Sequence, residues 1–298
     1  MSKNNNLHTA KTAKNDEFYT LMEDIEKEMR YYKDLFKGKV VYCNCDDYQQ
    51  SNFYKYFYYN FHYLKLKKLI CTCFNANDNG LYAIYDGVTE LTGKLNGDGD
   101  FRSEECIEYL KQADVVVTNP PFSLFRQYVQ QLMDYNKKFI IIGNMNAITY
   151  KEIFPYIKNN QLWMGCSLNG TKCSFGVPES YNGNNVYIDD GKRMGKVNNA
   201  CWFTNIENKR RNEELDLYKR YSFEDYPKYD NYDAIEVSRV DEIPMDYDGV
   251  MGVPITFLFK YNPTQFEIIK FRKGDDDKDL SVNGKAPYFR ILIRKIMK

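Results

Sequence analysis

The strongest constraint on the fold of this chain is an alternation of short apolar runs with longer segments of helical periodicity. Four runs have the composition of strands that are buried on both faces: 39–43, 69–74, 114–118 and 139–143. Segments in which apolar residues recur every three or four positions lie before and between these runs, at 16–36, from Ser51, from Ser103 and at 124–133. This alternation predicts an α/β fold with a mostly parallel, doubly wound sheet and helices on both of its faces.

The loops that follow the strands are where we expect a binding site. In open parallel sheets, ligands bind outside the carboxyl ends of the strands. The three loops in question are 44–50, 74–80 and 119–123. Their side chains should therefore meet at one edge of the sheet.

The alternation stops after about residue 160. Short runs with aromatic residues and glycine follow at 161–166, 173–178 and 200–204, and we expect them to be the last strands of the sheet, with an antiparallel edge. Beyond them come a charged stretch, a stretch rich in Pro, Tyr and Asp, and a further apolar run. This change predicts a first domain over residues 1–205 and a second, α+β lobe over residues 206–298.

The composition excludes several classes of protein. Of 298 residues, 43% are hydrophobic and 28% are charged, which excludes a disordered chain, a collagen and a coiled coil. The 41 basic and 41 acidic residues cancel, but this does not exclude nucleic acid, because binding depends on where the positive charge lies. No apolar run is long enough to span a bilayer and the first residues lack the features of a signal peptide, so we expect a cytoplasmic protein without a membrane partner.

Eight cysteines raise the question of a metal site. Without an export signal, they fit free thiols in a reducing compartment. Cys43 and Cys45, like Cys71 and Cys73, are separated by one residue, which sends the two sulfurs to opposite faces of a strand. Structural zinc prefers roughly two to four intervening residues. We therefore expect small buried side chains and no metal, with a zinc or iron–sulfur site as the alternative.

The motif Asn119-Pro120-Pro121-Phe122 directly follows the run 114–118 and carries the strongest chemical indication. An exocyclic amine on an aromatic base is a poor nucleophile, because its lone pair is delocalised into the ring. Two acceptors that each receive a hydrogen bond from the amine direct this lone pair at a methyl donor. The Asn119 amide oxygen and the Pro120 carbonyl oxygen form such a pair of acceptors. The prolines stiffen the loop, and Phe122 can stack on the base. The motif predicts methylation of an amino group; an ordinary proline turn is the alternative.

Several segments together resemble the EcoRI-type family of adenine-specific DNA modification methylases. They span about residues 14–270 and include 14–20 (KNDEFYT), 41–47 (VYCNCDD), 99–103 (GDFRS), 118–123 (TNPPFS), 226–236 (YPKYDNYDAIE) and 251–257 (MGVPITF). The resemblance implies a Rossmann-like S-adenosylmethionine-dependent methyltransferase fold, with a catalytic domain over 1–205 and a target-recognition lobe over 206–298. It implies transfer of a methyl group from S-adenosylmethionine to N6 of an adenine that is flipped out of duplex DNA, in a restriction–modification system or as an orphan or phage methylase.

The resemblance also implies roles for individual residues. The catalytic loop would consist of Asn119, Pro120, Pro121 and Phe122. The cofactor-binding residues would be Phe18, Tyr19, Thr20, Cys43, Asn44, Cys45, Asp46, Asp47, Asn52, Phe74, Asn75, Asp100, Phe101 and Asn119. Among them, residues 18–20 match a segment that closes over the methionine end of the cofactor, and residues 100–101 match the element that binds its adenine.

The turn after the first predicted strand departs from most methyltransferases, because it lacks their glycine-rich sequence; the EcoRI-type family shares this departure. Its carboxylates, Asp46 and Asp47, suit the positive charge of the cofactor's α-ammonium or sulfonium group. They would repel a phosphate, which argues against a dinucleotide or a nucleoside triphosphate. The loop after the second strand has no acid before Asp78, so Asn75 and Asp78 are both candidates for binding the ribose hydroxyls.

Basic residues that could contact DNA phosphates fall into clusters. The residues that we predict to contact DNA are Lys192, Arg193, Lys209, Arg210 and Arg211. A further cluster, near the C-terminus, contains Arg290, Arg294, Lys295 and Lys298. A solvated surface is an equal alternative for each cluster. We expect a monomer, because methylating one adenine per visit needs no dimer, and a restriction endonuclease that cuts the same site as a candidate partner.

Two other functions stay open for the same residues. The first is an amino-methyltransferase that acts on RNA, on cytosine N4 or on a protein glutamine, since related motifs serve all of these substrates. The second is an inactive DNA-binding protein with a methyltransferase fold, for which the missing glycine-rich turn is the main argument. A nucleotide-dependent oxidoreductase is disfavoured, because the chain lacks the glycine fingerprint of dinucleotide-binding turns.

Overall fold

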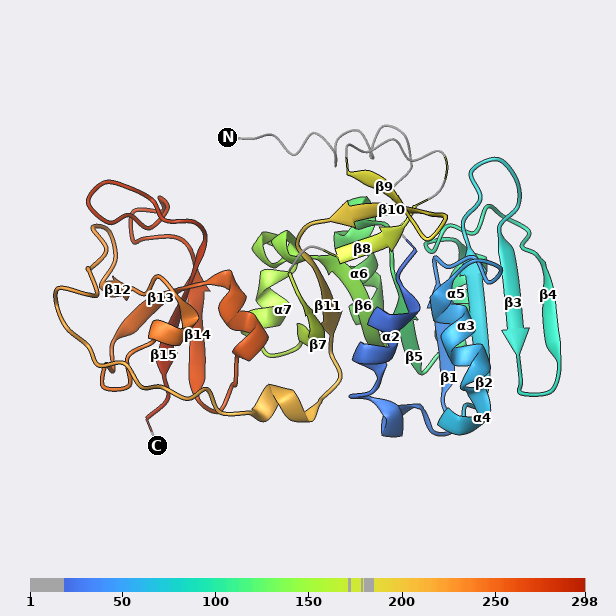
Figure 1. Cartoon of the computed structure of the whole chain (residues 1–298), viewed down its shortest axis with the longest axis horizontal. Coiled ribbons are helices and arrows are strands. Elements are labelled where there is room, and N and C mark those ends of the chain that lie inside the picture. The colour runs from blue at the N-terminus through green and yellow to red at the C-terminus, as the bar shows by residue number, and fades with distance from the viewer. Residues whose placement is uncertain (1–18, 171–172, 178, 180–184, 298) are drawn as a thin grey trace. The chain divides into compact units, whose positions relative to one another are not determined.

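The computed structural model describes residues 19–170, 173–177, 179 and 185–297. Phe18 and Lys298, two residues with predicted roles, lie outside these ranges. The chain divides into two compact units (Figure 1): unit 1 comprises Met1–Ala147 and Met164–Ile206, and unit 2 comprises Ile148–Trp163 and Glu207–Lys298. Residues 148–163 thus cluster with unit 2, whereas the predicted boundary assigns them to the first domain.

Unit 1 is built on a mixed sheet with the strand order β4-β3-β2-β1-β5-β6-β11-β7. Its central strands are parallel, as predicted: β1 (Val40–Asn44), β2 (Lys68–Cys73), β5 (Val115–Thr118) and β6 (Lys138–Asn144). β11 (Ala200–Thr204) runs antiparallel to β6, and β7 (Trp163–Asn169) follows it in the sheet. The predicted α/β class with a mostly parallel central sheet is therefore confirmed.

An antiparallel hairpin extends the other side of this sheet. It consists of β3 (Leu81–Tyr85), which pairs with β2, and β4 (Glu90–Lys94) at the edge. The sequence does not predict this hairpin. β3 is itself an apolar run, LYAIY, within a stretch rich in Gly and Asp, whereas all residues of β4 are exposed or half-buried and form no such run.

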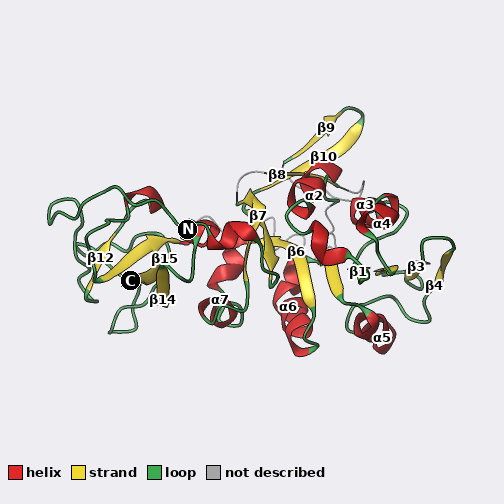
Figure 2. Cartoon of the chain, turned by 90° about the horizontal axis from the view of Figure 1, so that it is seen from below, coloured by secondary structure: helices red, strands yellow, loops and turns green. Residues whose placement is uncertain are grey.

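Helices cover both faces of the sheet (Figure 2). α2 (Met22–Met29), α3 (Asn52–Tyr59) and α4 (Phe61–Leu64) lie on one face, and α5 (Glu104–Gln112) and α6 (Phe125–Asp134) lie on the other. Ser51 and Ser103 cap α3 and α5, because their hydroxyl oxygens accept from backbone N–H groups of the first turn at 3.1 and 3.2 Å. Among the described residues, none of the helices combines the length and hydropathy that a bilayer-spanning segment requires.

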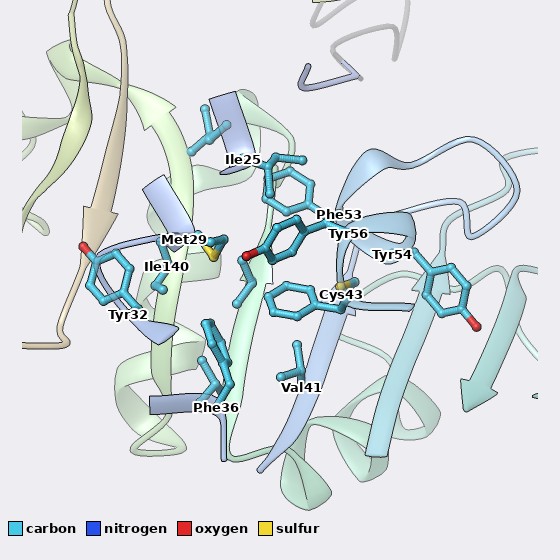
Figure 3. Packing of buried hydrophobic residues seen from close by; sticks show 14 of the residues in the cluster. Ile25, Met29, Tyr32, Phe36, Val41, Cys43, Phe53, Tyr54, Tyr56 and Ile140 are labelled. Atoms are coloured by element: carbon cyan, nitrogen blue, oxygen red, sulfur yellow. The ribbon is translucent and has the colours of Figure 1, made fainter. Parts of the chain in front are cut away.

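The core of unit 1 lies between α2, α3 and the sheet. Figure 3 shows Ile25 and Met29 of α2 beside Phe53 of α3, above Val41 and Ile140 of the sheet. The predicted helix over 16–36 is shorter in its described part: α2 ends at residue 29, and a 3₁₀ helix, η1 (Lys33–Phe36), follows. Between the two helices, Tyr32 has a φ of −124°, outside the helical range.

A buried carboxylate ties α2 to β7. Glu28 is 0% exposed, and its carboxylate accepts hydrogen bonds from the Cys166 and Ser167 amides at 2.9 and 2.7 Å. The hydroxyls of Ser167 and Tyr32 donate to it at 2.7 and 2.9 Å. Burial raises the pKa of Glu28, and these hydrogen bonds act in the opposite direction. Gly165 makes room for this contact, since a Cβ there would lie 2.4 Å from the Glu28 carboxylate.

A three-stranded sheet lies at the carboxyl-end edge of the central strands (Figure 1). Its order is β8-β10-β9, with β8 (Cys173–Gly176), β9 (Val186–Asp189) and β10 (Lys192–Val197). The prediction that 173–178 belongs to the main sheet is wrong for residues 173–176, because they pair with β10 instead. Tyr19 pairs with Gly176, which connects the segment before α2 to this small sheet.

Unit 2 contains a four-stranded sheet with the order β12-β13-β15-β14. Its strands are β12 (Ala234–Glu236), β13 (Val250–Pro254), β15 (Arg290–Lys295) and β14 (Phe266–Phe271). α7 (Phe154–Lys158) packs on β14, with the Phe154 and Phe271 ring centroids 5.2 Å apart. The remaining 3₁₀ helices of the described chain are η2 (Phe122–Leu124), η3 (Met145–Thr149), η4 (Lys209–Asn212), η5 (Val240–Glu242) and η6 (Ile255–Lys260).

Candidate active site

A cavity of about 210 Å³ opens at the carboxyl ends of β1, β2 and β5. Its lining residues are Tyr19, Cys45, Asp46, Asp47, Cys73, Phe74, Asn75, Leu81 and Asn119. All of them except Cys73 and Leu81 have a role predicted from the sequence. They meet because β2, β1 and β5 are parallel neighbours, so the loops that follow these strands leave the sheet at the same edge.

The turn after β1 is built without glycine. Cys45 has a φ of +68°, a left-handed conformation that costs a non-glycine residue about 1 kcal/mol or more. The turn is held by the Asp46 amide, which donates to the Thr72 carbonyl oxygen at 2.9 Å. Cys43 and Asn44 are fully buried beneath the turn and do not line the cavity, and burial raises the pKa of the Cys43 thiol. Their predicted contact with a cofactor is therefore indirect in this conformation.

Both carboxylates of the turn already accept hydrogen bonds from the protein. Asp46 is 8% exposed, and it accepts from the Ser51 hydroxyl at 2.6 Å and from the Thr118 hydroxyl. Asp47 accepts from the Gln49 amide at 2.9 Å, which closes a tight turn after the strand. The carboxylates thus shape the loop, and Asp46 and Asp47 are both among the residues that line the cavity.

The segment before α2 is fixed at the cavity by two contacts. The Tyr19 N–H and carbonyl oxygen each form a 2.8 Å hydrogen bond with the backbone of Gly176. The Asn52 amide nitrogen donates to the Thr20 carbonyl oxygen at 2.8 Å. Tyr19 lines the cavity, whereas Thr20 is 2% exposed and Asn52 supports it from α3. The structure therefore brings Tyr19, Thr20 and Asn52 together, and the predicted role of Phe18 lies outside the described residues.

The loop after β2 packs against the loop that precedes α5. The Asn75 amide donates to the Asp98 carbonyl oxygen at 2.8 Å, and the Gly80 amide donates to the Gly97 carbonyl oxygen at 2.9 Å. Asp78 pairs with Lys94, which lowers the pKa of this exposed carboxyl. Of the two candidates for the ribose hydroxyls, Asn75 lines the cavity and Asp78 does not.

Asp100 and Phe101 do not line the cavity in this conformation. The Arg102 guanidinium holds the Asp100 carboxylate with two hydrogen bonds, at 2.9 and 2.6 Å, and keeps the pKa of Asp100 below its ordinary value. Phe101 is 3% exposed and meets Tyr128 of α6 edge-on, with ring centroids 4.9 Å apart. Their predicted contact with the cofactor's adenine stays a prediction, and it requires Arg102 to share or release the carboxylate.

Gly99→Ala is expected to lower the free energy of unfolding by about 2–3 kcal/mol. Gly99 has a φ of +82°, and a Cβ there would lie 2.2 Å from the Cys73 carbonyl oxygen, a backbone atom at the end of β2. Gly97→Ala is a matched control, because nothing lies within 4 Å of a Cβ at Gly97. Urea unfolding measures the difference, and equal stability of the two variants would contradict the close packing of the two loops.

The catalytic motif is only partly open to the cavity. Asn119 is half-buried and lines the cavity, whereas Pro120 is buried and Pro121 half-buried. Phe122 is 8% exposed, and its ring belongs to the hydrophobic core of unit 1. The prediction that Phe122 presents a stacking face is therefore not met in this conformation, because the ring is covered by its neighbours.

The predicted DNA-binding residues differ in their exposure. Lys192 is exposed and Arg193 half-buried on β10, and Lys209 and Arg210 are exposed on η4. Arg211 lies instead inside unit 2: its guanidinium stacks 3.5 Å from the Trp163 ring centroid and pairs with Glu207 and Asn160. Its predicted contact with phosphate is corrected accordingly, since the positive charge is buried and already paired.

The basic cluster near the C-terminus is also paired. Arg290 is bound to Glu236 by hydrogen bonds of 2.9 and 2.6 Å, with both side chains largely buried. Arg294 pairs with Glu267 at 2.8 Å, and Lys295 lies 3.4 Å from an Asp248 carboxylate oxygen. The three described residues of this cluster therefore carry little free positive charge.

Within the described ranges, no group of three or more His, Cys, Asp or Glu side chains could hold a metal ion. The cysteines are free thiols. Cys43 and Cys71 are partners in the β1–β2 register, and burial raises the pKa of both thiols. Cys45 and Cys73 are half-buried at the cavity wall.

Sequence reasoning misses three residues of this site. Leu81 depends on β3, whose pairing is not visible in the sequence, and Cys73 is predicted only as a small buried side chain, with a metal ligand as the alternative. Thr118 occurs in the motif but has no predicted role. A signal for it exists, because Thr118 is the one polar residue between the apolar run 115–117 and Asn119.

Comparison with known proteins shows what this chain resembles as a whole. The family described as "Adenine-specific methyltransferase EcoRI" matches residues 6–296. The type II methyltransferase M.EcoRI of Escherichia coli is 52% identical over an alignment that covers 97% of this chain and 95% of the relative. No solved structure matches the chain significantly.

Two mycoplasma proteins are also similar over nearly their whole length. The type II methyltransferase M.MpnI of Mycoplasma pneumoniae is 45% identical, and M.MgeORF184P of Mycoplasma genitalium is 41% identical. In both cases the alignment covers 97% of this chain and 98% of the relative. The similarity therefore includes both compact units.

Proposed function

This chain belongs to the EcoRI family of adenine-specific methyltransferases, and from this premise we propose that it transfers a methyl group from S-adenosylmethionine to N6 of an adenine in duplex DNA. One observation carries the proposal: Asn119, Asp46 and Asp47 line the same cavity. The cavity therefore combines a residue that can accept hydrogen bonds from an amine with two acidic residues that suit a cationic methyl donor. The relatives' names as type II methyltransferases support a role in restriction–modification.

The chemistry of the cavity fits S-adenosylmethionine. Asp46 and Asp47 would hold its α-ammonium group, because carboxylates form charge-assisted hydrogen bonds with such a cation. Phe74 and Leu81 offer apolar surface, and the Asn75 amide would bind the ribose. When bound, the cofactor supplies an electrophilic methyl group on a sulfonium sulfur. The two carboxylates disfavour a ligand that carries a phosphate.

Asn119 would activate the target amine by accepting a hydrogen bond from it. Its amide oxygen and the Pro120 carbonyl oxygen would each accept a hydrogen bond from one N6 hydrogen, so that the nitrogen lone pair points at the methyl group. The base has to leave the duplex to reach the cavity, which costs a few kcal/mol of stacking and pairing. Phe122 would turn out of the core to stack on the flipped base. Direct transfer of the methyl group requires no covalent bond between enzyme and base.

We further propose that unit 1 is the Rossmann-like catalytic domain and that unit 2 recognises the target sequence. Lys192 and Arg193 in unit 1, and Lys209 and Arg210 in unit 2, would contact DNA phosphates. These four side chains are exposed or half-buried. The enzyme would act as a monomer, and a restriction endonuclease that cuts the same site would be its functional partner.

The test of this function is transfer of a labelled methyl group from S-adenosylmethionine to AT-rich duplex DNA, followed by digestion to nucleosides. We expect N6-methyladenine as the labelled product. Label in N4-methylcytosine, in RNA or in protein would contradict the proposed substrate. Binding of S-adenosylmethionine without transfer to any of these substrates would instead support a DNA-binding protein that has lost the activity.

A further inference from the structure

Thr118, the last residue of β5, connects the turn after β1 to the catalytic loop. It is fully buried and directly precedes Asn119 in the chain. Its hydroxyl donates a hydrogen bond that is shared between the Asn44 carbonyl oxygen and the Asp46 carboxylate. The residue is therefore attached covalently to the catalytic asparagine and by its side chain to the turn that faces the donor.

The Asp46 carboxylate is engaged from a second side as well. The Ser51 hydroxyl donates to Asp46 Oδ1 at 2.6 Å, and its oxygen accepts from the Phe53 amide at 3.1 Å. Asp46 itself is 8% exposed and lines the cavity. One carboxylate thus joins the turn after β1, the start of α3 and the end of β5.

We propose that Thr118 is a positioning residue, which aligns Asn119 with the methyl donor through its hydrogen bond to Asp46; this inference rests on the proposed function. Groups that act on reacting atoms have to be held within about 0.5 Å of their productive positions. A hydrogen bond to a buried carboxylate is well suited to this, because it is short and stronger than one between neutral groups. The hydrogen bond would thereby fix the position of Asn119, which faces the base, relative to the turn, which faces the methyl donor.

If the Thr118 hydroxyl only stabilised the fold, its removal would affect methyl transfer no more than the removal of another buried threonine hydroxyl. Thr204 supplies that comparison. Thr204 is the last residue of β11 and is also fully buried. Its hydroxyl donates to the Phe139 carbonyl oxygen at 2.7 Å and accepts from the Ile206 amide at 3.1 Å. Thr204 lies on β11, which β6 separates from β5, and its two hydrogen-bond partners belong neither to the turn after β1 nor to the catalytic loop.

The experiment measures single-turnover methyl transfer to duplex DNA at saturating S-adenosylmethionine, together with urea unfolding of each variant. We expect Thr118→Val to lower the rate constant about 10- to 100-fold, as for the loss of one hydrogen bond to a charged group. Thr118→Ser keeps the hydroxyl and should restore the rate constant to within about threefold of wild type. Thr204→Val should lose comparable stability and keep the wild-type rate constant.

A double-mutant cycle tests whether Asp46 is the link. Combining Thr118→Val with Asp46→Asn should lower the rate constant no further than the more harmful single change, because both remove the same connection. Additive losses would contradict the link. Thr118→Ala, which introduces no additional bulk, provides a second variant with the same expected loss should the valine substitution impair folding.

The outcomes separate this inference from the proposed function. A wild-type rate constant for Thr118→Val, or an equal loss for Thr204→Val, would overturn the positioning role and leave the proposed function intact. Absence of methyl transfer to DNA by the wild-type chain would overturn the proposed function itself.

Discussion

Asn119→Ala is expected to lower the rate of methyl transfer to adenine by about 100- to 1,000-fold, the loss that follows removal of one preorganised hydrogen-bonding group from an active site. Asn119 is the residue of the catalytic motif that lines the cavity. Without its amide oxygen, only the Pro120 carbonyl oxygen remains to accept from the amine, so the nitrogen lone pair is no longer held toward the donor. The loss should appear in the transfer step at saturating S-adenosylmethionine, with folding largely retained.

Single-turnover transfer from labelled S-adenosylmethionine to duplex DNA measures this loss, and calorimetry measures the affinity for the cofactor. Asn198→Ala is a matched control, because Asn198 is an exposed asparagine of the same unit. Asn119→Asp is an informative second variant, since it keeps an acceptor oxygen and should retain more activity than Asn119→Ala. Wild-type transfer by Asn119→Ala would rule out the proposed mechanism.

Glu28→Ala is expected to lower the free energy of unfolding by about 3–5 kcal/mol, a large part of the roughly 5–15 kcal/mol that keeps a typical domain folded. The change removes the acceptor of four donors, the amides of Cys166 and Ser167 and the hydroxyls of Ser167 and Tyr32. These groups have no water to replace the carboxylate, because Glu28 is 0% exposed. The contact between α2 and β7 should therefore be lost.

The control for Glu28 lies on the same helix. Glu23 has a side chain that is 73% exposed and forms an ion pair with Lys27 at 2.7 Å, so Glu23→Ala should change stability by no more than about 0.5 kcal/mol. Glu28→Gln keeps one acceptor oxygen and should fall between the two alanine variants. Urea unfolding distinguishes the three, and similar midpoints for Glu28→Ala and Glu23→Ala would refute the structural role of the buried carboxylate.

The central strands of unit 1 can be predicted from the sequence because they are buried on both faces. Such strands are uninterrupted apolar runs, as β5 and β6 illustrate, and no tertiary information is needed to recognise them. The edge strand β4 cannot be recognised in this way, since its exposed residues carry no such pattern, and the apolar run of β3 does not reveal that it pairs antiparallel with β2. Residues 173–176 show a further limit: an apolar segment reveals that it is buried, but not which sheet it joins.

The candidate site likewise has some features that the sequence reveals and others that depend on long-range packing. The meeting of Asp46 and Asn119 follows from two loops that leave neighbouring parallel strands, which the order of elements already suggests. The burial of Arg211 depends on Trp163, a residue far earlier in the chain that packs under its guanidinium. The covered ring of Phe122 likewise depends on the packing of the whole core. Motifs thus identify the chemistry, whereas exposure is decided by long-range packing.

The pairing of Arg290, Arg294 and Lys295 with carboxylates has a consequence for attachment to a polyanion. Because these side chains stay with their carboxylates, they neutralise few phosphates, and few condensed counterions are released from the nucleic acid. Affinity that arises with little counterion release declines only slowly as ionic strength rises. Contacts to base edges and to the shape of the duplex would then supply a larger share of the binding energy. A chain with a net charge of +0 can in this way remain bound at salt concentrations that detach a strongly basic protein.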